Sequence, residues 1–372
     1  MAPLAGSFAA SFAATVAVGV AMAIARAERE RRAGRRRRAA ERQFALLPGE
    51  LPGDGLRRMA LGQLDLAIDL LSRGRPDERA VHETRKAIKR LRALVRLLRH
   101  QLGEETFASE NAALRDAGRR LAGARDAEVM VASLDRLIRA HPRRLGRRRG
   151  VKRLRRALER ERRATAARAL GDDAMRAQVL SELRAVRRRI EGWQLTGLPG
   201  IEALERDLGR IYRDGRRRMR RAARGKGDRA RAMHEWRKRV KDLRYAAEML
   251  ERHDPLEHKN ARRRRVREDP GARRLRRLAR RADRLGEALG EEHDLAVLAQ
   301  RVSAHGGGHR HGGERRGMGR GSRRALLKVI ARRRRRLRSQ TLREGARLYR
   351  RRPRRFLRRV RRAYDRASLS RR

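Results

Sequence analysis

The sequence predicts an all-α protein built from an internal repeat, and three observations support this prediction. Nearly every long segment carries apolar residues at the spacing of a helix, and few runs show the alternation of a strand. The third observation is a helical cassette that occurs twice: VHETRKAIKRLRALVRLLR at residues 81–99 aligns without a gap with MHEWRKRVKDLRYAAEMLE at residues 233–251. Such a repeat predicts two related structural halves.

The first half spans about residues 50–191 and begins with an amphipathic helix at 56–73. Gly74 ends this helix, and Pro76 and Asp77 begin the cassette helix, which runs to about residue 102. Further helices are expected at 105–122, at 126–140 and, on either side of a break near Gly171, within 151–191. The turn-rich segment 192–200 closes the half.

The second half, about residues 200–365, repeats this order. We expect, in sequence, a helix containing 208–219, a loop at 225–228, the second cassette helix to about 253, helices at 272–289 and 291–304, a glycine-rich loop at 304–313, and a last basic helix to Pro353 before a short tail. The stretch GRRLAGARDAEVM at 118–130 also matches GEALGEEHDLAVL at 286–298. Each half should therefore be a helical bundle, and a pseudo-two-fold axis would bring the two cassettes together.

The charge balance points to a strongly acidic partner. Lys and Arg number 104 against 44 Asp and Glu, a net charge of +60, so the compact state repels itself unless a polyanion or counterions neutralise it. Nearly all of these cations are arginine, which indicates a compositional background, but lysine persists in the cassettes as Lys86, Lys89, Lys238 and Lys241. An aromatic content of 3% argues against proteins that stack single-stranded bases on rings. The absence of cysteine excludes disulfides and thiolate metal sites.

A helical wheel places the cations of each cassette on one face beside an apolar face. The candidate ligands are His82, Arg85, Lys86, Lys89, Arg92 and Arg96 in the first cassette, and His234, Arg237, Lys238, Lys241 and Arg244 in the second. Like charges at this spacing destabilise a bare helix, so the pattern favours a bound anion over a solvated face, which is the alternative. The stripe from His82 to Arg92 is about 15 Å long, enough for several phosphates in a chain.

The cassettes resemble the CHAD domain, the "conserved histidine α-helical domain". Its hallmark HxxRKxxKxLR is present as HETRKAIKRLR and HEWRKRVKDLR, and a second signature resembling LGxxxDxxV is present as LAGARDAEV and LGEEHDLAV. The resemblance covers about residues 50–365. It implies two four-helix bundles around a central basic channel that binds inorganic polyphosphate without catalysis and without a cofactor. The hallmark ExExK of the triphosphatase domain that precedes some family members is not expected here, because the nearest strings, ERERR at 28–32 and 159–163, lack the lysine.

Other polar residues were weighed as sites. Second-tier anion ligands are predicted at Arg57, Arg125, Tyr212, Arg213, Arg216 and His293, with packing as the alternative for Tyr212. The acidic residues around Asp126 and Asp294 are expected to orient channel cations by ion pairing or capping rather than to hold a metal. Three histidines in the glycine-rich loop, His305, His309 and His311, are expected to be solvated. Binding should tighten between pH 8 and 5.5 if His82 and His234 gain charge.

The N-terminal segment 1–49 joins an uncharged stretch to an arginine-rich linker. Residues 4–25 are long enough for a membrane anchor, and the alternative is a loosely packed helix. The resemblance implies a cytoplasmic protein at polyphosphate granules, whereas an anchor would place it on the cytoplasmic face of the membrane. The last residues, 366–372, are predicted to be a tail.

Two other functions remain open at this point. The net charge alone would permit a nonspecific nucleic-acid binding protein. A phosphatase or phosphotransferase that uses His82 and His234 is the third hypothesis, although none of the common catalytic motifs occurs.

Overall fold

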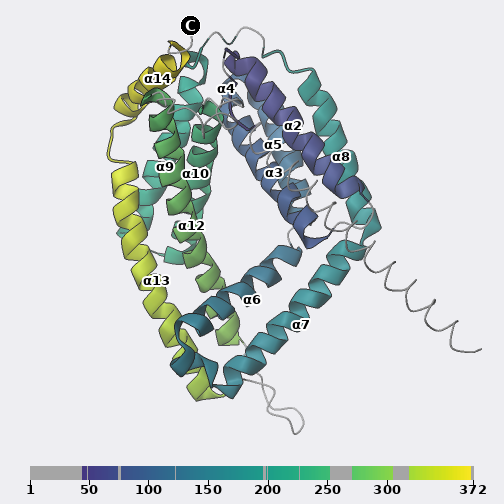
Figure 1. Cartoon of the computed structure of the whole chain (residues 1–372), viewed down its shortest axis with the longest axis vertical. Coiled ribbons are helices and arrows are strands. Elements are labelled where there is room, and N and C mark those ends of the chain that lie inside the picture. Colours follow the sequence, from purple (N-terminus) through teal and green to yellow (C-terminus); the bar gives the residue numbers. More distant parts are fainter. Residues whose placement is uncertain are drawn as a thin grey trace, which may run out of the picture. The chain divides into compact units, whose positions relative to one another are not determined.

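A computed structural model describes residues 44–47, 49–73, 77–121, 123–195, 198, 200–225, 227–251, 270–304 and 318–369 (Figure 1). The chain divides into two compact units, residues 1–44 and 45–372. All regular elements in these ranges are helices and none is a strand, which confirms the all-α prediction. None of the described helices has the length and apolar character needed to cross a bilayer. The proposed anchor at residues 4–25 lies outside the described residues.

Four helices of the first half contact one another in a ring. They are α2 (Pro52–Ser72), α3 (Glu78–Leu97), α5 (Glu104–Arg120) and α8 (Asp173–Glu191). Helix α2 packs against α3 and α8, and α5 packs against the same two helices. The short helix α4 (Arg99–Leu102) follows α3. Asp77 accepts a hydrogen bond from the backbone N–H of Ala80 at 2.7 Å and so caps α3, as the start signal in the sequence predicts.

A second ring joins α9 (Glu202–Arg224), α10 (Arg229–Leu250), α12 (Pro270–Ala304) and α14 (Pro353–Leu369). Helix α10 packs against α9 and α12, and α14 packs against the same two helices. Asp228 caps α10 through the N–H of Arg231 at 3.0 Å. The two cassettes thus occupy the same position in their respective rings, because α3 and α10 are each the second helix of the set.

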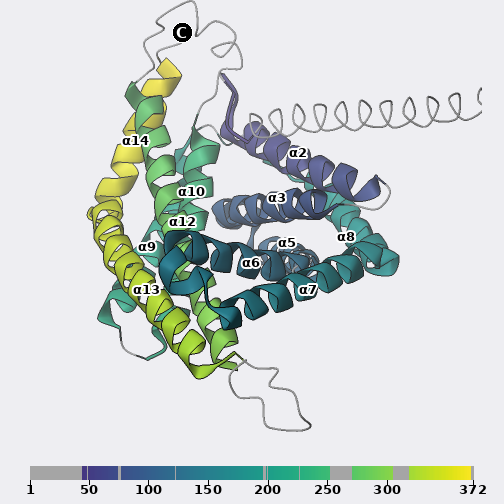
Figure 2. The same cartoon turned by 60° about the horizontal axis from the view of Figure 1, so that its bottom comes forward.

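The remaining helices build a core that both halves share. Helices α6 (Gly123–Ala140) and α7 (Arg149–Gly171), joined by the π-helical turn Pro142–Gly146, contact each other, while α12 packs against α6 and α13 (Arg320–Leu348) against α7 (Figures 1 and 2). One hydrophobic cluster runs through all four and includes Leu134, Leu154, Leu298 and Leu326. Residues 123–171 of the first half therefore pack with the second half, so that the halves are not separate packing units.

The internal repeat is visible in the packing of two glycines. A Cβ added to Gly118 would lie 3.3 Å from Cγ2 of Ile88, and one added to Gly286 would lie 3.8 Å from Cγ1 of Val240. These pairs occupy equivalent positions in the two repeats. In each half a glycine thus lets the following helix approach the cassette helix at the same place.

One of the two predicted breaks between helices was wrong. Residues 272–289 and 291–304 form one helix, α12, of 35 residues. Gly290 does not break it; a Cβ there would lie 3.1 Å from Nη2 of Arg237, so this glycine serves a close approach between helices. The break predicted near Gly171 is present, since α7 ends there and α8 begins at Asp173.

The C-terminal end also differs from the prediction. Pro353 does not lead into a tail but starts α14, which reaches Leu369. Proline is well suited to the first helical turn because it has no N–H to lose there. Helix α14 buries Phe356, Val360 and Tyr364, which explains why this arginine-rich segment folds onto α9 and α12.

The contact between α10 and α13 generates a stability prediction. Trp236 is fully buried, and a Cβ on Gly345 would lie 2.4 Å from its Cζ2. We expect Gly345→Ala to lower the free energy of unfolding by about 1–3 kcal/mol, because the indole cannot yield in a packed core. Urea unfolding followed by circular dichroism would measure this.

Gly321→Ala in the same helix is the matched control. A Cβ added to Gly321 would lie 3.8 Å from Nη1 of Arg148, which is an ordinary van der Waals contact. Alanine there should therefore stabilise the helix by about 0.5–1 kcal/mol. Equal effects of the two substitutions would contradict the close contact at Gly345.

Candidate functional site

The cassettes bury the apolar faces that the helical wheel predicts. Val81, Ile88, Leu91, Val95 and Leu98 of the first cassette are all buried, as are Val240, Leu243, Ala247 and Leu250 of the second. This packing fixes the rotation of α3 and α10 about their axes. The basic residues therefore lie along the edge of each packed face.

The two cassettes meet at a pair of equivalent lysines. Helices α3 and α10 contact each other, and Lys89 of α3 is close enough to influence Lys241 of α10. Burial, together with the positive charges of Arg237, Lys89 and Arg244, lowers the pKa of Lys241 to about 7, while Asp294 opposes the shift. The positively charged lysine is thus crowded by like charges from both repeats.

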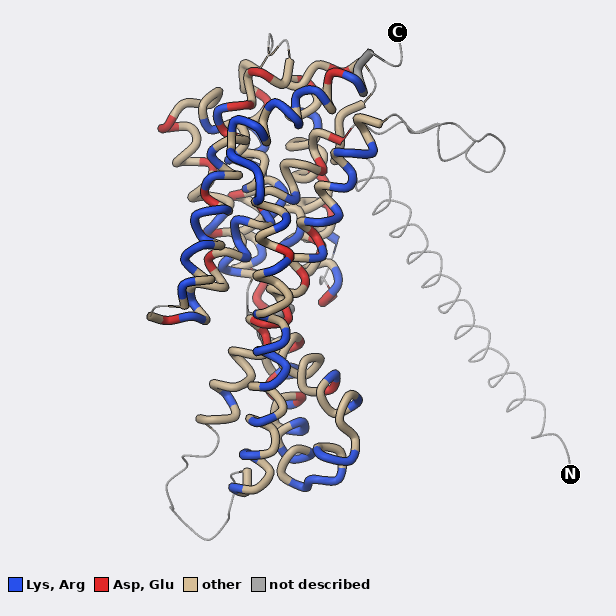
Figure 3. The backbone as a smooth tube through the Cα atoms, turned by 90° about the vertical axis from the view of Figure 1, so that its left-hand side faces the viewer, with Lys and Arg blue, Asp and Glu red and all other residues tan. Residues whose placement is uncertain are grey.

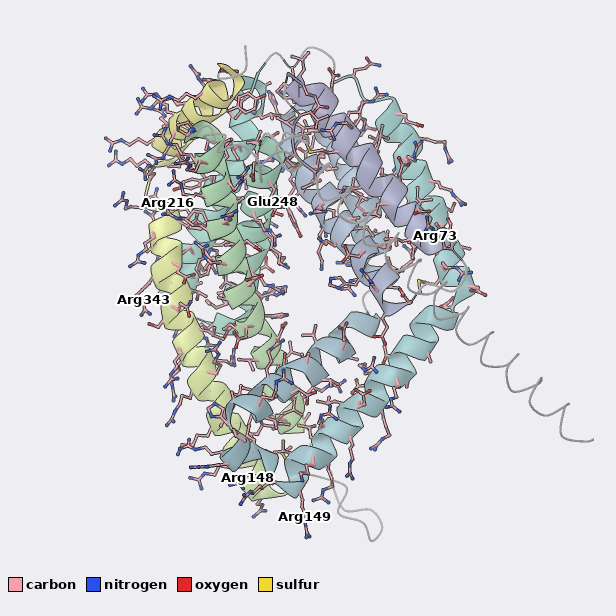
Figure 4. All side chains as sticks on the ribbon, viewed as in Figure 1. Arg73, Arg148, Arg149, Arg216, Glu248 and Arg343 are labelled. Atoms are coloured by element: carbon pink, nitrogen blue, oxygen red, sulfur yellow. The ribbon has the colours of Figure 1, made fainter. Side chains whose placement is uncertain are left out.

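A hollow of about 520 Å³ lies beside Lys241, one member of this lysine pair. Three of its cations, Arg237, Lys241 and Arg244, come from α10, and Arg136 comes from α6. The wall from α12 is formed by Gly286, Gly290 and four acidic residues, Asp283, Glu287, Glu291 and Asp294. Figure 4 shows side chains of these helices extending between the ribbons.

Within the first cassette, several cations are held by the protein. Arg85 donates a hydrogen bond to the carbonyl of Leu121 at 2.7 Å, and Lys86 lies 3.6 Å from the carboxylate of Glu83. His82 is half-buried and Lys89 is exposed. Lys89 is thus the most accessible member of this stripe.

Arg92 and Arg96 lie at the far end of the stripe. Both donate to Oδ1 of Asn111 at 3.3 Å, and Arg96 also pairs with Asp242 of the second cassette at 3.2 Å. Burial and the charge of Arg96 lower the pKa of Arg92 to about 10, so it remains cationic at neutral pH. The ion pair of Arg96 makes this residue a link between the two cassette helices.

In the second cassette, the outer cations are partly neutralised. Arg244 pairs with Glu248 at 2.6 Å and with Asp283, and Lys238 pairs with Glu235. Glu248 replaces the arginine of the first cassette, Arg96, and therefore changes the local charge pattern. Arg237 and Lys241 remain as the cations nearest to the glycines of α12.

His234 does not act as the expected pH switch in the free protein. Its ring lies 4.2 Å from that of His293, centroid to centroid, and its Nδ1 is buried without a hydrogen-bond partner in the described structure. Burial and then the charge of His293 lower the pKa of His234 to about 4. This histidine is therefore neutral between pH 8 and 5.5, whereas Lys241, with a pKa of about 7, titrates in this range.

The predicted second-tier residues separate into several groups. His293 joins the site through His234, whereas Arg57 donates to the carbonyls of Ile190 and Glu191 at the end of α8. Tyr212 is fully buried, stacks on Phe356 at 3.9 Å and donates to the carbonyl of Arg351 at 3.0 Å, which favours the packing alternative.

The last three second-tier residues differ in how much the structure describes. Arg213 of α9 is exposed. Arg216 of the same helix, which is labelled in Figure 4, is half-buried. The side chain of Arg125 lies outside the described residues.

Two acidic residues of α12 form ion pairs, but with arginines of α13 rather than with the cassette cations that they were expected to orient. Glu291 pairs with Arg333 at 2.7 Å, and the fully buried Glu292 pairs with Arg334 at 2.9 Å and Arg338 at 2.8 Å. Over the described part of the chain, no cluster of three metal-ligating side chains occurs. The histidines of the glycine-rich loop lie outside this part.

Sequence reasoning missed two residues that shape the site. Asp242 pairs with Arg96 at 3.2 Å and Arg239 at 3.0 Å, and Arg136 reaches the hollow from α6. A signal for Asp242 existed, because it stands where the first cassette has Arg90. No signal in the sequence placed α6 beside the second cassette.

Comparison with known protein families matches the CHAD domain over residues 56–303. The match includes both cassettes and both LGxxxDxxV-like stretches, and α13 and α14 follow it and pack against α12. A search of curated proteins found no match.

The lowered pKa of Lys241 predicts a pH-dependent stability. Between about pH 7 and 10.5 the unfolded chain holds one more proton at this lysine than the folded chain, so stability rises with pH. We expect Lys241→Met to raise the free energy of unfolding by about 1–3 kcal/mol at pH 7 and to flatten the dependence up to pH 10. Chemical unfolding at a series of pH values would measure it.

Lys152→Met is a control on α7 far from the cassettes in sequence, at an exposed position. It should leave the pH dependence unchanged. A Lys241→Met protein that is less stable than the parent at pH 7 would contradict a crowded, half-buried cation.

Proposed function

The chain belongs to the CHAD domain family, and we propose that it binds inorganic polyphosphate, without catalysis, in a basic channel between its two cassettes. The observation that carries this proposal is the approach of Lys89 to Lys241. These lysines occupy the same position in the two repeats, and their positive charges repel each other. A pseudo-two-fold axis through this pair would relate two four-helix bundles. The first consists of α2, α3, α5 and α8, and the second of α9, α10, α12 and α14.

The energetics of the cations favour a linear polyanion as the ligand. Bringing like charges together in a half-buried place costs free energy unless an anion fills it. Arginine forks bind phosphoryl oxygens bidentately and lysine acts as a mobile point charge, and both types line the hollow. The four acidic residues on its α12 wall would disfavour an anion spread over the whole hollow, so a narrow chain along the cation side of α10 fits best.

A binding role without catalysis agrees with the state of His234. A neutral ring that packs on His293 lacks the charge that would stabilise a phosphoryl transition state. We therefore propose no phosphatase activity. Release of phosphate from polyphosphate and Mg²⁺, lost when His82 and His234 are both replaced by alanine, would overturn this part of the proposal.

Nonspecific nucleic-acid binding is the second candidate function. Figure 3 shows basic residues spread over the helices rather than confined to α3 and α10, which is the charge distribution that duplex DNA would need. Polyphosphate is preferred because the equivalent lysines of the two repeats meet at one place. Association with polyphosphate granules, or attachment to a membrane through residues 4–25, follows as a proposal about location that fractionation of the full chain against a chain without residues 1–40 would decide.

Charge reversal of the lysine pair tests the proposed binding site. Lys89→Glu with Lys241→Glu should lower the affinity for long-chain polyphosphate at least tenfold, because two attractive charges become repulsive at the point where the repeats meet. Fluorescence titration with chains of increasing length, at two salt concentrations, should also show affinity that rises with length and falls with salt.

Arg332→Glu with Arg335→Glu is the matched control. Both are exposed on α13 and are distinct from Arg333 and Arg334, which pair with α12. Equal losses in the two double variants, or equal competition by duplex DNA at matched charge, would mean that binding is diffuse and the proposal is wrong.

The affinity for polyphosphate should depend on pH. A bound polyanion raises the pKa of Lys241, so affinity should increase roughly tenfold from pH 8.5 to 6.5 as the free protein takes up the proton that binding requires. The guanidinium groups of Arg237 and Arg244, which face this lysine, keep their charge over this range. Lys241→Arg should flatten the dependence, because arginine stays protonated.

His234→Gln separates the two explanations of a pH effect. The dependence should persist in this variant, since His234 is neutral in the free protein over the whole range. A dependence that disappears with His234→Gln and survives Lys241→Arg would contradict the assignment to the lysine.

A further inference from the structure

A second basic hollow lies where α12, α13 and α14 meet. Its volume is about 280 Å³. Six arginines from these three helices and the connection before α14 line it: Arg274, Arg277, Arg281, Arg347, Arg351 and Arg359. None of the cassette residues belongs to it. Its floor is apolar and includes Phe356 and Val360.

The six arginines converge without a carboxylate between them. Across the described ranges, no acidic side chain lines the hollow and no ion pair involves any of the six. Burial lowers the pKa of Arg359, and the charges of Arg351, Arg274, Arg277 and Arg281 lower it further. By contrast, many other arginines of α12 and α13 do have acidic partners, such as Arg276 with Glu251 and Arg338 with Glu292.

This hollow is separate from the cassette site. At about 100° per residue, Arg274, Arg277 and Arg281 lie on one face of α12, and Gly286, Gly290 and Asp294, which line the cassette hollow, lie on roughly the opposite face. An anion in one hollow therefore cannot contact the other without passing around the helix.

We propose that the hollow formed by α12, α13 and α14 is a second anion site, which binds a short run of condensed phosphoryl groups. Guanidinium forks bind phosphoryl oxygens bidentately, so six arginines around a hollow of about 280 Å³ suit a short condensed phosphate such as tripolyphosphate. The ring of Phe356 is buried against Tyr212 and offers no free face for a base, which disfavours a nucleic-acid strand.

The ligand could be a free oligophosphate or a stretch of a longer polyphosphate chain. Both sources have the same chemistry at this site, and the experiment separates them. The inference does not depend on the cassette site, because the residues of the two hollows do not overlap.

The test uses the full chain with Lys89→Gln and Lys241→Gln, which weakens the cassette site, as the background. Isothermal titration with tripolyphosphate compares Arg277→Gln, Arg281→Gln and Arg359→Gln with the control Arg280→Gln, Arg284→Gln and Arg358→Gln. Both sets remove two charges from α12 and one from α14, and the control residues are exposed outside the hollow. We expect at least a tenfold loss of affinity in the first set and less than twofold in the control.

Equal losses in the two sets, or no tripolyphosphate binding in the background protein, would overturn the second site. If the triple variant does not fold, Arg277→Gln alone against Arg280→Gln alone carries the test, since both positions are exposed. The proposed polyphosphate function fails separately, if Lys89→Gln with Lys241→Gln leaves long-chain affinity unchanged.

A final arm repeats the comparison with long-chain polyphosphate in the protein with intact cassettes. A loss in the first set alone identifies a stretch of the long chain as the occupant. Unchanged long-chain affinity together with lost tripolyphosphate binding identifies a free oligophosphate, and both results support the site.

Discussion

The approach of Lys89 to Lys241 across the contact between α3 and α10 is the constraint on which the site depends. Two like charges would separate these helices if nothing else held them. An attractive contact at the other end of α3 offsets this repulsion, because Arg96 pairs with Asp242 of α10 at 3.2 Å. Just beyond it, Asp207 of α9 accepts the N–H of His100 in α4 at 2.7 Å. The ion pair of Arg96 with Asp242 thus holds α3 against α10, while Asp294 only partly offsets the like charges around Lys241.

The shared core of α6, α7, α12 and α13 adds a second constraint. Because Leu134 and Leu154 from the first half pack with Leu298 and Leu326 from the second, the halves cannot separate without exposing apolar surface. Helix α12 carries this core at its C-terminal end and the glycines that face α10 nearer its middle. One rigid helix therefore positions the cation hollow and connects the halves.

Local patterns predicted much of this fold. The apolar stripes of α3 and α10, the cap at Asp77 and the break at Gly171 depend on near neighbours in the chain, so periodicity and capping rules identify them. Gly290 was misinterpreted because a glycine in a helix can be a break or a close contact, and only the residue opposite decides which. Pro353 was misinterpreted because a proline can follow the end of one helix and also begin the next. The packing of α6 and α7 with α13 is a long-range arrangement with no local signal.

The candidate site shows the same division. The repeat predicted which cations share a face, but not which of them the protein neutralises: Arg244 has Glu248 and Asp283, and Arg96 has Asp242. Glu248 lies four residues from Arg244 on the same helix and could be read from the charge pattern, whereas Asp283 and Asp242 come from other helices than the arginines they pair with. Lysines are rare in this chain, so an NMR titration of labelled lysine side chains can follow Lys241 directly. The account predicts a pKa near 7 that rises in Lys89→Gln and rises further with polyphosphate; an ordinary lysine pKa that ignores both changes would contradict it.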